Sequence, residues 1–480
     1  MLTLRDVPKL PRQGLLGHVG TSTQEQLVFQ RSLCDIEAPL VQGRVLHMPL
    51  LVPCTPQAVH EVLVTKGKSF EKTPGLRVLF HFLAGKGLFT SEGPLWRRQR
   101  KLMSPIFQPA PIAEYAEIMR GVANKAADRM ADGQTVDIAR ETMRIAMAVV
   151  GRALFEMETD DEADELGAAL TLALSWVNEH SMSPALVAHV LTLDATDTLA
   201  SKTSGQLRDA LLRLHQKAEA PVLLPGSRAP ALLDAVHKLD VLLQQIIDDR
   251  RRKGLTGKDL LTRLLLAREE DRDGSSMSDK QVRDEAVTLF VAGHETTANA
   301  LAWSFYLLSR DPESLARARA EADAFGDGPI KHWEPARLAF CTRVFREALR
   351  MYPPLTILPR RTLEDVELCG YLIPKRTITM VSTYAIHHRS SVYECPDKFD
   401  PDRWLEEREA RRHKSAFLPF GAGPRFCIGV HFAMMEGPIV LATLLRRWRF
   451  ERNAEQTIEW DNFATLRPRG GVPMQVRSRN

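Results

Sequence analysis

Residues 420–429, near the C-terminus, constrain the fold of this chain more than any other stretch. They place Cys427 in a loop with three glycines, with Arg425 just before it and an apolar helical run after it. A soft thiolate on a tight turn suits an iron centre, and the N-terminus of the following helix favours the thiolate. The glycines would let the backbone approach a flat cofactor, and Arg425 can offer a cation to a cofactor carboxylate. In the alternative interpretation, Cys427 is a buried small hydrophobe ahead of a core helix.

The bulk composition excludes several classes of protein. The chain has 480 residues, 44% of them hydrophobic, and a net charge of +4, which is too weakly basic to indicate a nucleic-acid partner. Six cysteines without CxxC spacing argue against zinc ribbons and disulfide frameworks and favour a reducing compartment. No apolar run has the length of a membrane span, and the first residues lack the apolar region of a signal peptide. We therefore expect a soluble, cytoplasmic protein.

Hydrophobic periodicity predicts a mainly helical chain. Helices are expected at residues 24–33, 56–66, 112–131, 140–156, 162–178, 204–216, 230–252, 258–268, 278–309 and 340–350. Strand patterns occupy 41–52 and 358–374, and residues 184–203 and 221–230 are expected to be flexible connections. The apolar segment 76–89 is either part of the core or a loop over a substrate.

The long helix at 278–309 carries the run Ala292-Gly293-His294-Glu295-Thr296-Thr297. A threonine within a helix can bond the carbonyl one turn back and distort the helix, and such distortions often mark function. The alternative is a kinked structural helix with a solvated acid. His294 cannot face the same way as Thr296, so we expect a structural role for it.

Two residue pairs share a helix face. Trp96 and Arg100, in a helix that Pro94 opens, can present an N–H and a guanidinium to one acceptor, or form a cation–π pair at the surface. Glu347 and Arg350 lie three apart, a spacing that is common in surface salt bridges of little energetic value.

These motifs resemble, in their order, those of the cytochromes P450. The match includes the sequence Pro401-Asp402-Arg403-Trp404, where the family usually ends in Phe, and extends over roughly residues 14–476. The resemblance implies a mainly α fold with a smaller β-rich lobe. It implies a single domain over residues 1–480, β-rich to about residue 75 and helical thereafter. It also implies haem b, iron protoporphyrin IX, as the cofactor.

The resemblance further implies a role for each candidate residue. Cys427 is the metal ligand, and Thr296 and Glu295 form the catalytic proton relay. The cofactor-binding residues are Trp96, Arg100, Ala292, Gly293, Arg360, Phe420, Gly421, Arg425, Cys427 and Gly429. Gly293 is expected to leave room for dioxygen, and Arg360 to bind a propionate, with Arg361 as its competitor. A buried structural network consists of Glu347, Arg350 and Arg403, and His387 and His388 are also structural. The substrate pocket is lined by Leu79, Phe82, Phe290, Ile357 and Phe463.

The implied function is a haem-thiolate monooxygenase that uses O2 to hydroxylate or otherwise oxidise an apolar molecule, such as a fatty acid, terpenoid, steroid or polyketide. No GxGxxG fingerprint is evident, so electrons must come from a ferredoxin or flavodoxin with its reductase, and we expect a monomer. Three basic clusters are either a docking face for that partner or solvated helix faces; they are Arg97, Arg98 and Lys101; Arg411, Arg412 and Lys414; and Arg446, Arg447 and Arg449. The alternatives are a peroxide-dependent peroxygenase, against which Glu295 and Thr296 argue, and a non-catalytic haem-based sensor.

Overall fold

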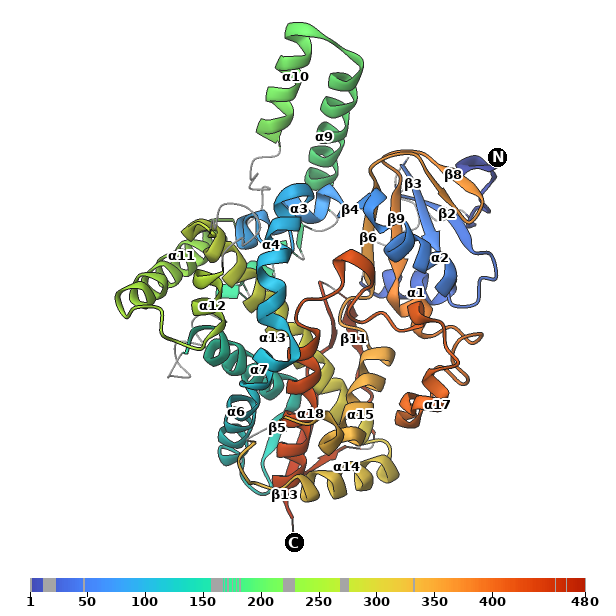
Figure 1. The fold of residues 1–480 in the computed structure, drawn as a ribbon. Helices are drawn as coiled ribbons and strands as arrows, with labels where there is room; N and C mark the ends of the chain where they lie inside the picture. The colour runs from blue at the N-terminus through green and yellow to red at the C-terminus, as the bar shows by residue number, and fades with distance from the viewer. Residues whose placement is uncertain are drawn as a thin grey trace. The chain divides into compact units, whose positions relative to one another are not determined.

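The structure is a computed structural model (Figure 1) that describes residues 2–11, 23–45, 48–156, 183–218, 229–267, 276–330, 333–453, 455–462 and 464–479, with parts of 167–180. Contacts divide the chain into two compact units. The first comprises Met1–Glu71, Ser104–Ala153 and Ala292–Asn480, and the second Lys72–Met103 and Leu154–Val291. The long helix α13 (Asp279–Leu308) contributes residues to both units. The expectation of one domain over residues 1–480 stays a prediction.

A five-stranded sheet in the first unit joins two distant parts of the sequence, in the order β2-β3-β9-β6-β4. Its strands are β2 (Leu40–Val45), β3 (Met48–Pro53), β4 (Phe70–Glu71), β6 (Ile357–Thr362) and β9 (Ile378–Ser382). β2 and β3 form the expected hairpin, with Val41 opposite Val52. The strand-rich region is therefore not confined to the N-terminal portion, because the sheet pairs residues as distant in sequence as Leu50 and Ile378.

Smaller sheets and a layer of helices complete the first unit. The other strands are β1 (Leu2–Thr3), β5 (Thr135–Asp137), β7 (Val366–Leu368), β8 (Tyr371–Ile373), β10 (Trp448–Arg452), β11 (Trp460–Asn462), β12 (Leu466–Pro468) and β13 (Pro473–Ser478). The α-helices are α1 (Thr23–Ser32), α2 (Pro56–His60), α5 (Pro109–Ala113), α6 (Ala116–Asp128), α7 (Ile138–Phe155), α14 (Pro312–Phe325), α15 (Ala339–Met351), α16 (Thr383–His387), α17 (Glu406–Glu409) and α18 (Val430–Arg447).

Short helical turns connect these elements. They are the π-helical turn η2 (Glu61–Thr65) and the 3₁₀ turns η1 (Leu4–Asp6), η3 (Gly67–Ser69), η4 (Ser104–Phe107), η5 (Pro335–Leu338), η6 (Pro401–Trp404), η7 (Lys414–Ala416) and η8 (Gly423–Arg425). α18 packs against α6, α14 and α15. Gly437 permits a close approach of α18 to α15, since an added Cβ would lie 2.7 Å from the ring of Phe345.

The second unit is helical, as Figure 1 shows. Its helices, besides the first part of α13, are α3 (Pro74–Ala84), α4 (Gly93–Met103), α9 (Pro184–Lys202), α10 (Gly205–Ala218), α11 (Ala229–Arg252) and α12 (Leu260–Leu266). The prediction of a flexible connection at 184–203 was wrong, because α9 occupies almost all of it. The missed signal was the cap: the Ser183 hydroxyl accepts a hydrogen bond from the Leu186 amide at 3.2 Å, and Pro184 opens the helix.

The segment after α3 is a firmly bonded loop rather than a continuous core element. The buried ammonium of Lys72 donates to the carbonyls of Leu88, Phe89 and Ser91 at 2.8–3.0 Å. The carboxylate of the buried Glu285, on α13, accepts a hydrogen bond from the Leu88 amide at 2.8 Å. Burial raises the pKa of Glu285 to about 8.

Among the described residues, no helix combines the length and apolarity needed to cross a membrane.

Candidate active site

The cysteine loop, residues 417–429, is closed by its own backbone hydrogen bonds. The Cys427 amide donates to the Phe420 carbonyl at 2.9 Å, and the Gly421 amide donates to the Leu418 carbonyl at 3.0 Å. Gly429 then begins α18 as its N-cap residue. Cys427 is exposed, so the loop presents a fixed thiol to an open face instead of burying it as a small hydrophobe.

Gly423 is needed because a neighbouring stretch of protein backbone lies too close for a side chain. The sequence had instead suggested that the glycine allows the loop to approach a cofactor. Its φ is +68°, and a Cβ built there would lie 1.8 Å from the Leu63 carbonyl oxygen in η2. Gly421 also has a positive φ, +70°, but its nearest neighbours would be 3.9 Å away, at Leu358 Cδ1 and the Arg425 carbonyl oxygen. The loop is therefore pressed against η2 at Gly423 and lies beside β6 at Gly421.

The alternation of side chains along β6 separates the two arginines that compete for a cofactor carboxylate. Leu358 faces the cysteine loop, and Arg360, two residues on, lies on the same face of β6. Arg361 lies on the other face, where its guanidinium donates to Glu71 Oε1 at 2.6 and 2.8 Å. Because Arg361 is committed to Glu71, this geometry favours Arg360.

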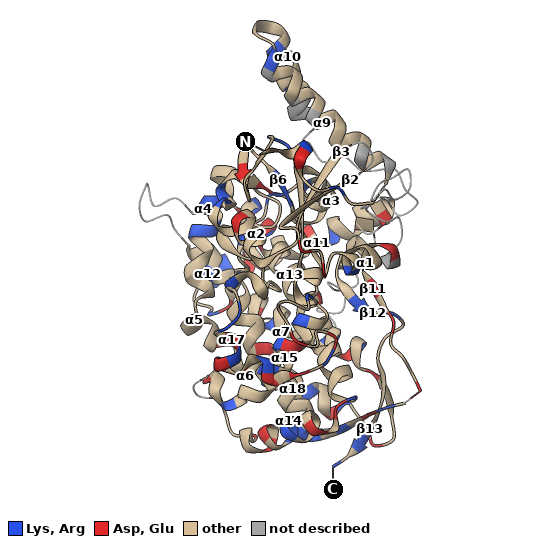
Figure 2. Cartoon of the chain, turned by 90° about the vertical axis from the view of Figure 1, so that its right-hand side faces the viewer, with Lys and Arg blue, Asp and Glu red and all other residues tan. Residues whose placement is uncertain are grey.

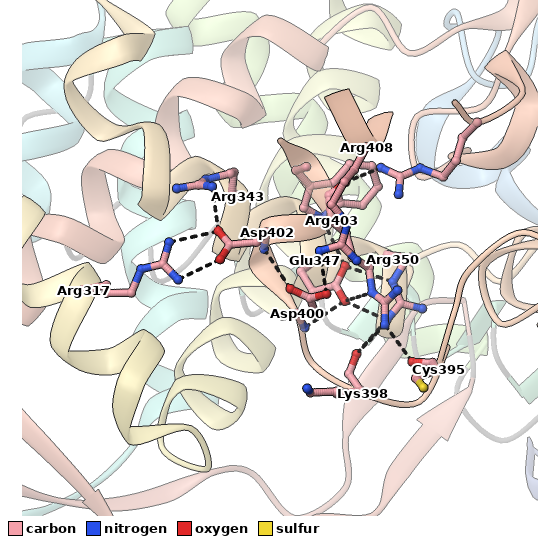
Figure 3. A network of polar contacts seen from close by, with 12 residues as sticks. Arg317, Arg343, Glu347, Arg350, Cys395, Lys398, Asp400, Asp402, Arg403 and Arg408 are labelled. Atoms are coloured by element: carbon pink, nitrogen blue, oxygen red, sulfur yellow. Dashed lines mark hydrogen bonds and ion pairs between the residues drawn. The ribbon is translucent and has the colours of Figure 1, made fainter. Parts of the chain in front are cut away.

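Figure 3 shows the charge network around Glu347, which is completely buried. Arg350 donates two hydrogen bonds to the Glu347 carboxylate at 2.8 and 2.9 Å, and Arg403 donates one at 3.1 Å. The indole N–H of Trp404 donates another at 3.1 Å, which a phenylalanine could not do. The network therefore holds η6 against α15, and Trp404 adds to it.

Thr296 and Glu295 sit in the first-unit part of α13. The Thr296 hydroxyl donates to the Ala292 carbonyl at 2.7 Å, one turn back, as the sequence predicted. Ala292 is exposed in the middle of a largely buried helix. The open side of Gly293 instead faces Val150 of α7, 3.1 Å from a Cβ placed there. Ala292 is therefore the more exposed residue of the two, and the role expected of Gly293 stays a prediction.

Glu295 is held by residues that the motifs did not identify. The hydroxyl of Thr465, just before β12, donates to Glu295 Oε1 at 2.7 Å. The amide of Asn299, one turn along α13, donates to the same hydroxyl at 3.1 Å. Asn299 could have been suspected from its helical spacing, whereas Thr465 gave no local signal. His294 is buried, consistent with the structural role expected for it.

The remaining candidates are placed within their own units. Trp96 and Arg100 are half-buried, one turn apart on α4 of the second unit. In the same unit, Leu79 is buried on α3, Phe82 contacts Trp176 edge to face, and Phe290 stacks on Phe155. In the first unit, Ile357 packs against the cluster of Met380 and Ala385. Phe463 lies outside the described residues. The pocket assignments stay predictions.

Lys and Arg lie on several elements of the chain, α4 among them (Figure 2). Arg446, Arg447 and Arg449 form ion pairs with Asp327, Asp128 and Glu451, respectively. The guanidinium of Arg412 lies over the rings of Tyr393 and Trp404. By contrast, Lys66 and Lys68 are exposed on either side of Gly67, where an added Cβ would lie 3.0 Å from Pro424 of the cysteine loop. The sequence analysis did not single out these two lysines, because they form a pair and not a group of three basic residues.

Comparison with known proteins decides the family. The family profile of cytochrome P450 matches residues 6–472. This chain belongs to the cytochrome P450 family. Cyclooctatin synthase of Streptomyces melanosporofaciens is 33% identical over 91% of this chain and 88% of its own length. Pentalenene oxygenase of Streptomyces avermitilis is 32% identical over 91% and 89%. Leukotriene-B4 omega-hydroxylase 3 of Mus musculus is 28% identical over 98% and 90%.

The fold comparison agrees with the family. The crystal structure of the cytochrome P450DA haem domain superimposes with a TM-score of 0.79, covering 99% of this chain and 98% of that one at 23% identity. The mainly α fold with a smaller β-rich lobe is confirmed. So are the monooxygenase class and haem as the cofactor.

The donor set of this P450 fits a haem. A thiol is exposed on a rigid loop, Arg360 lies on the β6 face beside that loop, and Ala292 leaves part of α13 uncovered. Thiolate, guanidinium and small apolar groups are what an iron porphyrin with carboxylate arms requires. When bound, the haem supplies the oxygen chemistry, and a thiolate ligand favours O–O cleavage.

Proposed function

We propose that Cys427 is the haem ligand of this P450. The observation that carries the proposal is its exposed thiol on a loop fixed by the bond from the Cys427 amide to the Phe420 carbonyl. Burial raises the thiol pKa of Cys34 to about 11 and those of Cys54 and Cys369 to about 12, so a thiolate is disfavoured at those sites. Burial also raises the pKa of the Cys341 thiol well above its ordinary value.

The protein's own residues control protons and water. The Thr296 hydroxyl, held at the Ala292 carbonyl, is placed to bind water on the open part of α13. Glu295 supplies protons while Thr465 fixes its carboxylate. This acid–alcohol pair favours a monooxygenase that takes electrons and protons over the peroxygenase alternative. Arg360, Arg425, Trp96 and Arg100 are proposed to bind the haem propionates.

We propose a polycyclic terpenoid as the substrate. Two relatives act on pentalenene and cyclooctat-9-en-7-ol by name, and both cover most of this chain. The pocket candidates are apolar, which fits a hydrocarbon skeleton. A fatty-acid derivative is the competing class, because a more distant relative hydroxylates leukotriene B4 by name. A spin-state titration with pentalenene and with a long-chain fatty acid distinguishes them, since only a substrate seated at the haem displaces water there.

We propose that an acidic ferredoxin or flavodoxin docks beside the cysteine loop, at Lys66 and Lys68. Both are exposed next to the loop, whereas the basic cluster of Arg446, Arg447 and Arg449 is occupied by ion pairs. The double variant Lys66→Glu/Lys68→Glu should slow reduction at least about tenfold at low salt and less at high salt. Arg449→Glu is the matched control and should change it little.

A monomer in the cytoplasm is the state proposed for this P450. An exposed thiol such as Cys427 or Cys395 stays reduced in that compartment. Sedimentation velocity tests whether the protein is a monomer.

The decisive experiment for the function is the carbon monoxide difference spectrum of reduced wild type and Cys427→Ser. The thiolate-type Soret band should be present only in wild type. A histidine- or thiol-type band in fresh wild-type protein would overturn the proposal and favour the sensor.

A further inference from the structure

We propose that His387 is a positioning residue that couples the Glu347 charge network to the cysteine loop. The inference rests on the proposed role of Cys427 as the haem ligand. His387 ends α16, is completely buried, and packs its ring against Phe417 at a centroid distance of 5.5 Å.

Each ring nitrogen of His387 is hydrogen-bonded to a backbone group that can act only as a donor or only as an acceptor. The Leu418 amide can only donate, and it lies 2.8 Å from His387 Nε2. The Arg350 carbonyl can only accept, and it lies 3.1 Å from His387 Nδ1. The imidazole must therefore carry its proton on Nδ1 and offer its lone pair on Nε2. Burial lowers the pKa of His387 and keeps the ring neutral.

The bonds of His387 give the Glu347 network a hydrogen-bonded link to the cysteine loop, in addition to the packing of Trp404 against Phe417. On one side, the Arg350 guanidinium returns a hydrogen bond to the His387 carbonyl at 2.9 Å while it holds Glu347. On the other side, Leu418 is fixed at both ends, since its carbonyl accepts from the Gly421 amide at 3.0 Å. Two residues beyond Leu418, the Phe420 carbonyl receives the Cys427 amide. The imidazole thus bridges the backbone of α15, at the Arg350 carbonyl, and the backbone of the cysteine loop, at the Leu418 amide.

His388 provides a matched control. It is also buried, and burial lowers its pKa to about 3. Its Nδ1 bonds to the Tyr384 carbonyl at 3.0 Å, one turn back, and its ring stacks on Tyr384 at 4.0 Å. A substitution at His388 therefore removes a buried imidazole of the same size without touching Leu418.

The test compares four variants of the holoenzyme. In His387→Gln, the amide oxygen can reach the position of Nε2 and accept from Leu418. His387→Asn is too short for that and can replace only Nδ1. His387→Leu replaces neither, and His388→Leu is the control. The readouts are the rate at which the reduced carbon monoxide complex converts from the thiolate-type to the thiol-type band, the haem reduction potential and the thermal midpoint.

We expect conversion roughly tenfold faster in His387→Leu and His387→Asn, from the buried amide left without an acceptor, and close to the wild-type rate in His387→Gln and His388→Leu. Equal conversion rates in His387→Gln and His387→Asn, or an unchanged rate in His387→Leu, would overturn the proposal. So would His388→Leu matching His387→Leu, because a general loss of stability would then explain both. If His387→Leu does not fold, the Gln and Asn pair decides. A wild type without a thiolate-type band would instead reject the Cys427 assignment itself.

Discussion

Replacing Gly423 with alanine should move the cysteine loop away from η2. The substitution adds two costs. A non-glycine residue at a φ of +68° costs about 1–2 kcal/mol. In addition, the new Cβ would stand 1.8 Å from the Leu63 carbonyl oxygen, where ordinary contact begins at 3.4 Å. The two backbones must therefore separate by roughly 1.6 Å, which is the difference between these distances, and such overpacking costs about 1–3 kcal/mol more.

Comparison with Gly421→Ala isolates the second cost, because that variant carries only the cost of the backbone conformation. Gly421 has nearly the same φ, +70°, but an added Cβ would find its nearest neighbours at 3.9 Å. Gly421→Ala should therefore weaken haem retention by about tenfold, and Gly423→Ala by a hundredfold or more, since about 1.4 kcal/mol corresponds to a factor of ten.

The assay is the rate of haem transfer from each variant to a haem-scavenging apoprotein, with the carbon monoxide difference spectrum as a second readout. A far-ultraviolet spectrum of each apoprotein controls for general misfolding. Equal haem loss in the two variants would refute the reasoning, because it would mean that the backbone conformation alone, and not the contact with Leu63, requires Gly423.

Three further predictions follow from single contacts. Thr465→Val should reduce the product formed per electron pair about tenfold by releasing Glu295, measured as peroxide against product, and unchanged coupling would contradict the clamp. Arg360→Ala should speed haem loss without lowering the apoprotein melting temperature, whereas Arg361→Ala, which strands Glu71, should lower that temperature; the reverse pattern would exchange their roles. His388 is neutral when folded and protonates on unfolding below its ordinary pKa, so it removes stability as the pH falls from about 6.5 toward its folded value of about 3. Between these values His388→Leu should flatten the pH dependence of the unfolding free energy by about 1.4 kcal/mol per pH unit, and parallel curves would exclude this linkage.

Sequence patterns were reliable where the interacting groups are close in the chain. The bonds from Arg350 to Glu347 and from Thr296 to the Ala292 carbonyl span three and four residues, so helical periodicity was enough to anticipate them. The cysteine loop is also local, since the bond that closes it joins residues seven apart. The α9 error was also local, since a Ser-Pro cap was overlooked.

The sequence by itself therefore determined the family, the mainly helical fold, the cofactor and the candidate ligand Cys427, since each depends on short spacings in a recognisable order. Only the tertiary structure decided which residues distant in the sequence contact the residues of the site. These contacts are Leu63 against Gly423, Thr465 at Glu295, His387 at Leu418, and Glu71 at Arg361. It also decided that Arg446 is paired with an acid while Lys66 and Lys68 are exposed beside the loop. The physical reason is that hydrogen bonds and carbon contacts act over a few ångströms. Partners far apart in the sequence are therefore chosen by where the folded backbone carries them, and no local pattern records that choice.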